Sequence, residues 1–301
     1  NTLSLHDALP IWSGAAPHAR WPNAAPIGNR IFSSSCAPTT WHASWTAGDP
    51  LDTERIIVII QARMSSTRLP GKVLKEIAGR PMLAWVVERA RKAQTITDVI
   101  VATTTESSDD PIVGFCAEMG YACTRGSLND VLDRFYQAAR AHRADVIVRV
   151  TADCPLIDPA EIDHVVREYK RSGVDFAANR LPPPFGRTYP IGLDTEVCSF
   201  AALERAWREA KEPYQREHVM PYLYEERGRF KVLRVDHDPD YGDLRWTVDT
   251  PQDLELVRAI FARMAGRADF GWLDVLKLFQ REPELARLNA GVGQKFYNKH
   301  G

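Results

Sequence analysis

A cation-rich polar loop follows the first strongly apolar segment of the chain. Residues Arg55–Ile60 form a short aliphatic run, which is typical of a strand buried on both faces of a parallel sheet. The next residues, QARMSSTRLPGK from Gln61 to Lys72, include Arg63 and Arg68. Backbone N–H groups of such a loop can surround a polyphosphate while Arg and Lys neutralise its oxygens. The loop lacks the Walker pattern, and a solvated basic turn is the alternative interpretation.

Two aspartates lie where strands are expected to end. Asp153 follows the apolar run Asp145–Val150 by three residues, and Asp249 directly precedes Thr250-Pro251, which opens a helix. Ligands of parallel sheets bind beyond the carboxyl ends of the strands, so both side chains are expected at such an edge. Carboxylates suit Mg²⁺, but Asp249 also fits a favourable charge at a helix N-terminus.

Strands and helices are expected to alternate between residues 54 and 172. Buried strands are predicted at 55–60, 98–103 and 145–150, a short one at 121–124, and helices after Pro81, Asp109 and Asp158. An S-x-x-D pattern, Ser127 to Asp130, precedes a further helix. This alternation indicates βαβ units and a mainly parallel sheet. After about residue 180 the pattern weakens, with a Pro-rich loop at 181–192, helices near 199–211, 216–227 and 251–264, and a strand at 230–235.

Composition excludes several classes of protein. The 301 residues carry 38 basic and 39 acidic side chains, so a net charge of −1 gives no electrostatic case for nucleic acid as a partner. The aliphatic runs are far shorter than the ~20 residues that span a bilayer. Five cysteines without a C-x-x-C pair are typical of a reducing compartment, so a cytoplasmic protein is expected.

The first 53 residues differ from the rest of the chain. They hold five charged residues and no helical or strand periodicity, and Thr2–Ile11 looks like a sequencing-adapter sequence read as protein. We therefore expect residues 1–53 to be an artefactual or disordered extension. A catalytic domain is expected at 54–265 and a helical extension at 266–301.

Several blocks together resemble a known enzyme family. Besides the loop, they are RGSLNDVLDRF (125–135), RVTADCPLIDP (149–159), RTYPIGLDTE (187–196), REHVMPY (216–222) and LRWTVDTPQDLE (244–255). Over about residues 54–298 they resemble cytidylyltransferases related to 3-deoxy-manno-octulosonate cytidylyltransferase, most closely the spore-coat-polysaccharide branch. The chain has Asp-Cys-Pro at 153–155 where sugar-acid enzymes commonly have Asp-Glu-Pro.

The resemblance implies a fold, a reaction and partners. It implies the nucleotide-diphospho-sugar transferase fold, a Rossmann-like three-layer α/β architecture with a mainly parallel sheet and an irregular acceptor and dimerisation region. It implies transfer of CMP from CTP to a sugar or sugar-acid acceptor, with release of pyrophosphate, for surface polysaccharide biosynthesis. Mg²⁺ is the implied cofactor, and a homodimer through residues 181–235 is the implied assembly.

The resemblance also assigns residues to sites. It implies that Asp153 and Asp249 hold the metal and act in catalysis with Arg63, Arg68 and Lys72. The implied nucleotide contacts are Gln61, Ala62, Arg63, Ser65, Arg68, Gly71, Lys72, Thr103, Gly126, Ser127 and Asp130, of which Ser127 and Asp130 also fit a helix cap. The acceptor candidates are Arg187, Tyr189, Arg216, Glu217, His218 and Arg245, of which His218 also fits a structural histidine.

Two other functions remain open at this point. A glycosyltransferase of related fold would consume a nucleotide sugar, but such enzymes typically carry a D-x-D motif, which Asp153-Cys-Pro155 does not supply. A non-catalytic nucleotide-binding module would not need the three loop cations together with both aspartates.

Overall fold

The computed structural model describes residues 54–182, 186–265, 267 and 269–293. The expectation for residues 1–53 therefore lies outside the described residues, as does the end of the expected C-terminal extension. The described residues belong to one compact unit.

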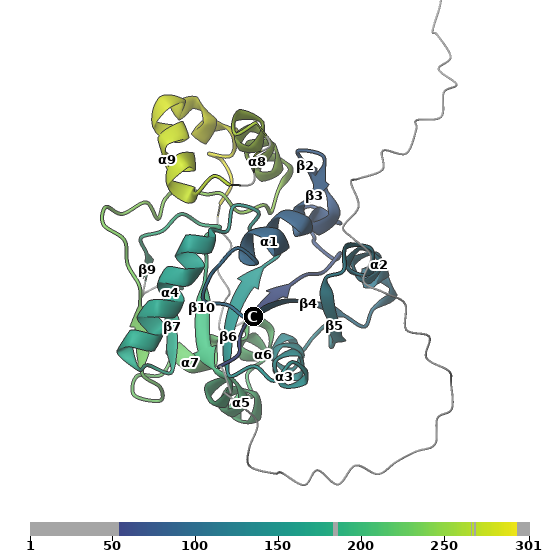
Figure 1. Ribbon diagram of the computed structural model, residues 1–301, viewed down its shortest axis with the longest axis vertical. Coiled ribbons are helices and arrows are strands. Elements are labelled where there is room, and N and C mark those ends of the chain that lie inside the picture. Colours follow the sequence, from purple (N-terminus) through teal and green to yellow (C-terminus); the bar gives the residue numbers. More distant parts are fainter. Residues whose placement is uncertain (1–53, 183–185, 266, 268, 294–301) are drawn as a thin grey trace, which may run out of the picture. The chain divides into compact units, whose positions relative to one another are not determined.

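A seven-stranded sheet forms the centre of this unit, in the order β11-β7-β10-β6-β1-β4-β5 (Figure 1). The parallel pairs β1–β4, β1–β6 and β4–β5 confirm the predicted parallel sheet, whereas β10 runs antiparallel to both β6 and β7. Because β1 lies between β6 and β4, its last residue, Gln61, pairs with both Thr151 and Ala102. The strands are β1 (Ile56–Gln61), β4 (Asp98–Thr104), β5 (Ala122–Gly126), β6 (Val146–Thr151), β7 (Phe176–Ala178), β10 (Glu196–Ser199) and β11 (Val232–Arg234).

Helices cover both faces of the sheet, because alternate residues of each strand point to opposite faces. Val58 and Ile60 of β1 pack in one core with α1 (Met82–Ala90), α2 (Asp110–Met119) and α4 (Pro159–Ser172). Ile57 and Ile59 pack in another with α3 (Val131–Ala141), α5 (Phe200–Glu209) and α7 (Pro221–Tyr224). The three-layer α/β prediction is confirmed.

A third apolar core joins the C-terminal helices to the rest of the unit. Trp85 of α1 and Trp246 pack with residues of α8 (Pro251–Arg263), α9 (Trp272–Arg281) and the 3-10 helix η3 (Pro283–Leu288). In the described part of the chain, no helix is both long and apolar enough to cross a membrane. Small hairpins complete the fold, β2 (Glu76–Ile77) with β3 (Arg80–Pro81) and β8 (Arg180–Leu181) with β9 (Gly186–Arg187).

Capping side chains mark the starts of α3 and α4, and the cap of α3 differs from the expected one. As predicted, Asp158 caps α4, accepting from Ala160 N at 2.8 Å. The S-x-x-D pattern instead places Asp130 at the cap of α3, while Ser127 Oγ accepts from Asp130 N at 3.0 Å, because the helix begins at Val131.

The helix expected over 216–227 is two short helices. They are α6 (Pro213–His218) and α7 (Pro221–Tyr224). Val219 between them has a φ of 72°, and Pro221 has no N–H with which to continue a helix. The break turns the chain after His218, at the end of α6.

Candidate active site

The loop after β1 is closed by one backbone hydrogen bond and anchored by a buried carboxylate. Gly71 N donates to Met64 O at 3.0 Å, and Gly71 has a φ of +67°, which glycine adopts without steric cost. Met64 N donates to Asp109 Oδ1 at 2.7 Å, and the hydroxyls of Thr103 and Thr104 donate to Asp109 Oδ2. Thr103, a predicted nucleotide contact, is thus turned toward Asp109. The sequence pattern marks Asp109 only as the start of a helix and gives no sign of this anchoring role.

Lys72 joins the two predicted metal-binding aspartates. Its ammonium lies 2.7 Å from Asp153 Oδ2 and 2.9 Å from Asp249 Oδ1, and it also donates to the carbonyl oxygen of Val248 at 2.8 Å. Lys72 begins the 3-10 helix η1 (Lys72–Leu74), Asp153 follows β6, and Asp249 precedes α8. Val248 N donates to Asp153 O at 2.8 Å, which holds the two acidic segments side by side. The fold therefore brings together residues that are far apart in the sequence.

The three charges stabilise one another in a largely buried position. Burial alone would lower the pKa of Lys72, but Asp153 and Asp249 outweigh it and raise that pKa above its ordinary value. Burial likewise opposes ionisation of Asp153, yet Lys72 lowers the Asp153 pKa to about 2. Both groups are therefore charged at neutral pH.

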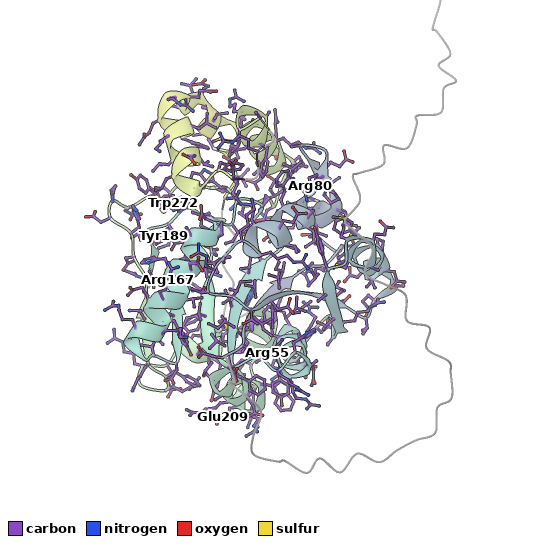
Figure 2. All side chains as sticks on the ribbon, viewed as in Figure 1. Arg55, Arg80, Arg167, Tyr189, Glu209 and Trp272 are labelled. Atoms are coloured by element: carbon purple, nitrogen blue, oxygen red, sulfur yellow. The ribbon has the colours of Figure 1, made fainter. Side chains whose placement is uncertain are left out.

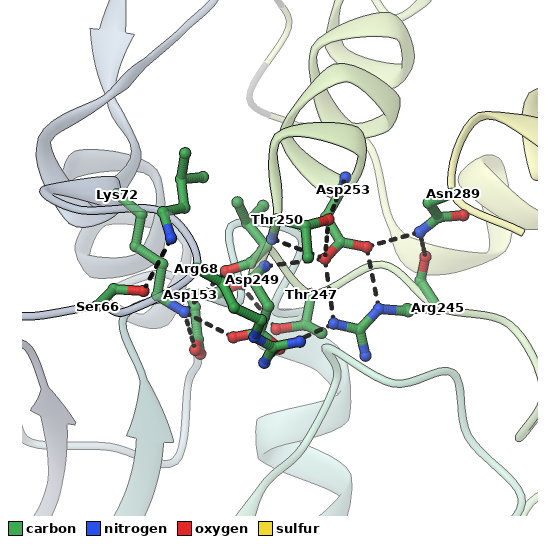
Figure 3. Close-up of polar contacts among 12 residues, drawn as sticks. Ser66, Arg68, Lys72, Asp153, Arg245, Thr247, Asp249, Thr250, Asp253 and Asn289 are labelled. Atoms are coloured by element: carbon green, nitrogen blue, oxygen red, sulfur yellow. Dashed lines mark hydrogen bonds and ion pairs between the residues drawn. The ribbon is translucent and has the colours of Figure 1, made fainter. Parts of the chain in front are cut away.

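A second row of charges holds Asp249 from the other side (Figure 3). Asp249 Oδ2 accepts from Arg245 Nη2 at 2.8 Å and pairs with Arg68 Nη2 at 3.0 Å. Arg245 is in turn bound by both oxygens of Asp253, at 3.0 and 3.1 Å, and Asn289 Nδ2 donates to Asp253 at 2.9 Å. Arg245, a predicted acceptor residue, thus lies behind Asp249. Asp253 and Asn289 were missed, although Asp253 stands three residues after Thr250 in a capping-box pattern.

A cavity of about 460 Å³ opens beside these carboxylates. Of the predicted nucleotide contacts, Gln61, Arg63, Arg68 and Lys72 line it, whereas Ala62 is buried and its N–H pairs with Ala102 O. The remaining lining residues are Ser66, Thr67, Val73, Thr151, Ala152, Asp153, Glu217, His218 and Asp249. The cavity thus gathers both predicted metal ligands, the loop cations and two acceptor candidates.

His218 lies in a partly buried corner of this cavity, near both basic and acidic side chains. Burial, with Arg149 and Arg180 nearby, lowers the pKa of His218 below 6.5 and outweighs the opposing effect of Glu217. The imidazole is therefore neutral at pH 7. A neutral ring at this place can both donate and accept a hydrogen bond.

A second, smaller hollow of about 150 Å³ shares Thr151, Asp153 and Asp249 with the first. The residues that line this hollow but not the larger cavity are Arg149, Cys154, Arg180, Ile191, Asp194, Glu196 and Thr247. Arg187, a predicted acceptor residue, lies behind it and holds Asp194 at 2.8 Å. Arg149, Asp194 and Glu196 lie within the motif blocks at 149–159 and 187–196 but were given no role from the sequence, and Arg180 lies outside those blocks.

Segment 126–130, which holds predicted nucleotide contacts, is bound to α6 through Asp130. Arg216, a predicted acceptor residue, binds Asp130 through Nε at 3.0 Å and Nη2 at 2.5 Å, and donates to Trp207 O at 2.6 Å. A Cβ on Gly126 would meet Arg134 Cγ at 3.0 Å, so this glycine permits close packing. Asp130 and Arg216 therefore fix α6, which carries Glu217 and His218, against α3.

Tyr189, the remaining acceptor candidate, is buried among aromatic rings. Its ring lies 5.7 Å from that of Trp272 (Figure 2). The ring of His237 lies 5.4 Å away. The exposed fraction of Tyr189 is 3%, and burial together with Glu161 raises its pKa above the ordinary value. Tyr189 thus packs beside the site and shares a buried environment with a carboxyl group of α4.

We expect ionisation of Glu161 to lower the free energy of unfolding between about pH 5 and pH 8. Burial raises the pKa of Glu161 to about 8, from 4.5, so the folded protein holds a proton that the unfolded chain releases. The contribution of Glu161 to the free energy of unfolding should then be largest below about pH 5, fall through this window and level off above it. At about 1.4 kcal/mol per unit, the expected loss between pH 5.5 and 8.5 is of order 3 kcal/mol.

The measurement is urea unfolding at several pH values for the natural chain and Glu161→Gln. The variant cannot ionise at this position, so its advantage should grow as the pH rises. Parallel stability curves for the two proteins would contradict this origin of the pH dependence.

The two aspartates meet the first requirement for one shared cation. Carboxylate oxygens of both lie within 2.9 Å of the same ammonium nitrogen, so they face one common point. Oxygen ligands suit Mg²⁺, which keeps waters and is commonly shared with substrate phosphates. Among the described residues, no cluster of three or more His, Cys, Asp or Glu side chains with metal-binding geometry occurs. The two carboxylates thus fit a metal ion whose remaining coordination positions are filled by phosphate oxygens.

Comparison with known proteins gives the family. Residues 57–260 match the cytidylyltransferase family. The spore coat polysaccharide biosynthesis protein SpsF of Bacillus subtilis is 31% identical, over 77% of this chain and 96% of its own length. The 3-deoxy-manno-octulosonate cytidylyltransferase of Anaeromyxobacter dehalogenans is also 31% identical, over 69% of this chain and 98% of its own length.

A solved structure agrees with these relatives. A cytidylyltransferase from Leptospira borgpetersenii superimposes with a TM-score of 0.73 at 31% identity, covering 82% of this chain and 100% of that one. The predicted family, fold and transferase class are confirmed, and the loop cations and paired aspartates occupy one cavity of that fold. The chain is a nucleotidyltransferase and belongs to the cytidylyltransferase family.

Proposed function

We propose that this enzyme transfers CMP from CTP to a hydroxyl of a sugar or sugar-acid acceptor and releases pyrophosphate. The names of two relatives support the donor and the pathway, since one is a 3-deoxy-manno-octulosonate cytidylyltransferase and the other a spore coat polysaccharide protein. The product would be an activated sugar for surface polysaccharide. A homodimer through residues 181–235 stays a prediction.

One observation carries the proposal: two carboxylates share one ammonium at the edge of a cation-lined cavity. Asp153 and Asp249 would hold Mg²⁺, which would neutralise charge on the α-phosphate as the acceptor attacks. Arg68 and Lys72 are already paired with these acids. In the described part of the chain no carboxylate pairs with Arg63, so its guanidinium is the cation free to meet the incoming triphosphate.

The reaction needs positioning and charge neutralisation more than covalent help. The acceptor oxygen attacks the α-phosphorus, the bond to the β-phosphate oxygen breaks, and pyrophosphate leaves. Arg63 and the closed loop hold the triphosphate in place, and Lys72 lies where negative charge accumulates. His218, neutral at pH 7, is placed in the same cavity to accept a hydrogen bond from the acceptor hydroxyl.

Pyrophosphate release tests the donor and the reaction class. The enzyme is assayed with Mg²⁺, a panel of acidic, neutral and phosphorylated sugars, and CTP, UTP, ATP or GTP in turn. We expect release from CTP at least tenfold faster than from the other three. Faster release from UTP or ATP would contradict the proposed donor, and consumption of a nucleotide sugar without pyrophosphate would indicate a glycosyltransferase.

A further inference from the structure

Two cysteines face each other where α2 packs on β5 (Figure 1). Cys116 lies in α2 and Cys123 in β5, and their thiols are joined by a hydrogen bond. Cys123 and Arg125 lie on the same face of the strand, because alternate residues of a strand share a face. Arg125 binds Asp110, the first residue of α2, at 2.7 Å. The helix is thus held to the strand at two points, by an ion pair at its start and by the two thiols at its last turn.

A tight turn between the two elements keeps the sulfurs together. The N–H of Tyr121 donates to the carbonyl oxygen of Cys116 at 2.8 Å. Gly120, directly after the helix, has a φ of +65°, which lets the chain reverse there without steric cost. Tyr121 is fixed in turn, because its hydroxyl donates to Glu88 at 3.0 Å. The backbone thus holds both thiols in contact, and a bond between them requires only a small approach of the two sulfurs.

The two thiols differ in exposure and in acidity. Cys116 is buried, whereas Cys123 is partly exposed. The hydrogen bond from the Cys116 thiol, with Arg125 nearby, outweighs burial and lowers the pKa of Cys123 below its ordinary value. The same hydrogen bond, together with burial, raises the pKa of Cys116. Because the thiolate is the reactive form, Cys123 is the nucleophile of the pair. Cys154 and Cys198, the other cysteines of the described residues, are buried, and burial raises the pKa of each.

We propose that Cys116 and Cys123 form a site of reversible oxidation by hydrogen peroxide. The Cys123 thiolate attacks the peroxide, the O–O bond breaks, the sulfur becomes a sulfenic acid, and the departing hydroxide takes up a proton and leaves as water. The Cys116 sulfur then attacks the Cys123 sulfur, the S–O bond breaks and a disulfide forms, while the hydroxyl group leaves with the Cys116 proton as a second water. The thiols lose two electrons and the peroxide gains them. A dithiol reductant reverses the step by thiol–disulfide exchange.

Mass spectrometry of the full chain after mild oxidation tests the proposal. The protein is treated with hydrogen peroxide, the excess is removed with catalase, and the remaining thiols are alkylated in denaturant before digestion with trypsin. One tryptic peptide, residues 93–125, carries both cysteines, because no Lys or Arg lies between Lys92 and Arg125. We expect this peptide to escape alkylation and to be lighter by two hydrogen atoms, and dithiothreitol to reverse both changes. The peptides that contain Cys154 and Cys198 should stay alkylated.

Single substitutions separate the roles of the two thiols. Cys116→Ala should leave a sulfenic acid on Cys123, trapped by dimedone at least roughly tenfold more than in the natural chain, because the second thiol is missing. Cys123→Ala should leave Cys116 unoxidised. Cys198→Ala removes another buried cysteine as the matched control and should form the disulfide as the natural chain does.

The natural chain alone can overturn the proposal, whether or not the variants fold. Alkylation of both Cys116 and Cys123 after peroxide treatment would do so. A disulfide that joins Cys123 to Cys36 or to a second chain, in place of Cys116, would also contradict it.

Discussion

Replacing Asp153 with Asn should lower turnover by at least a thousandfold, equivalent to about 4 kcal/mol of lost transition-state stabilisation. Asn has nearly the same shape, but it removes one of the two negative charges that would hold Mg²⁺ against the α-phosphate. Asp249→Asn should have a similar effect, because both carboxylates face the same point, now occupied by the Lys72 ammonium. Steady-state pyrophosphate release over a range of Mg²⁺ concentrations measures both losses.

The free energy of unfolding distinguishes a metal-binding role of Asp153 from a purely structural role. Lys72 lowers the pKa of Asp153 to about 2, so the charged carboxylate contributes to folding. A quarter of the Asp153 side chain is exposed, so we expect Asp153→Asn to cost only about 1–2 kcal/mol of unfolding free energy. Asp269→Asn, at an exposed ion pair, is the matched control and should change neither property. Turnover within tenfold of the natural chain in folded Asp153→Asn would remove this residue from the metal site.

Replacing Lys72 with Met should strengthen metal binding and weaken catalysis at the same time. All three donors of the ammonium are filled, by Asp153, Asp249 and the carbonyl oxygen of Val248. A divalent cation must therefore displace Lys72 from the carboxylates before it can bind between them. Without Lys72 the two carboxylates repel each other, and a cation relieves that repulsion.

Manganese binding in the absence of nucleotide measures this competition. Electron paramagnetic resonance of free Mn²⁺ should show affinity at least tenfold higher for Lys72→Met than for the natural chain, and turnover should fall at least tenfold, about 1.4 kcal/mol. Lys211→Met, at an exposed position, is the control. Equal Mn²⁺ affinity in the three proteins would show that Lys72 does not hold the place of a cation.

The sequence predicted the parallel half of the fold well, because local patterns determine it. The aliphatic run at 55–60 forms β1, and Asp153 lies just beyond the end of β6, where the strand-end rule predicted it. The antiparallel strand β10 was missed, because its residues Glu196–Ser199 have no alternating pattern. Its charged end supplies Glu196 to the smaller hollow.

Contacts between distant segments set the rest of the site. Asp109 reaches Met64 across 45 residues, and Asn289 reaches Asp253 across 36. No local pattern marks such partners, so the contacts of Thr103 with Asp109 and of Arg245 with Asp253 were not predicted. The ligand roles of Thr103 and Arg245 stay predictions. Asp153, Asp249 and Lys72 were selected by motif, and the structure adds that they contact one another.

Calorimetric titration with nucleoside triphosphates tests the central claim, that this cavity binds CTP through the loop cations and the paired aspartates. With Mg²⁺ present, the natural chain should bind one CTP per chain and bind UTP, ATP and GTP at least tenfold more weakly. Folded Arg63→Gln should bind CTP at least tenfold more weakly than the natural chain, because it loses the free guanidinium of the cavity. Absence of CTP binding, or equal affinity in the natural chain and Arg63→Gln, would contradict the account.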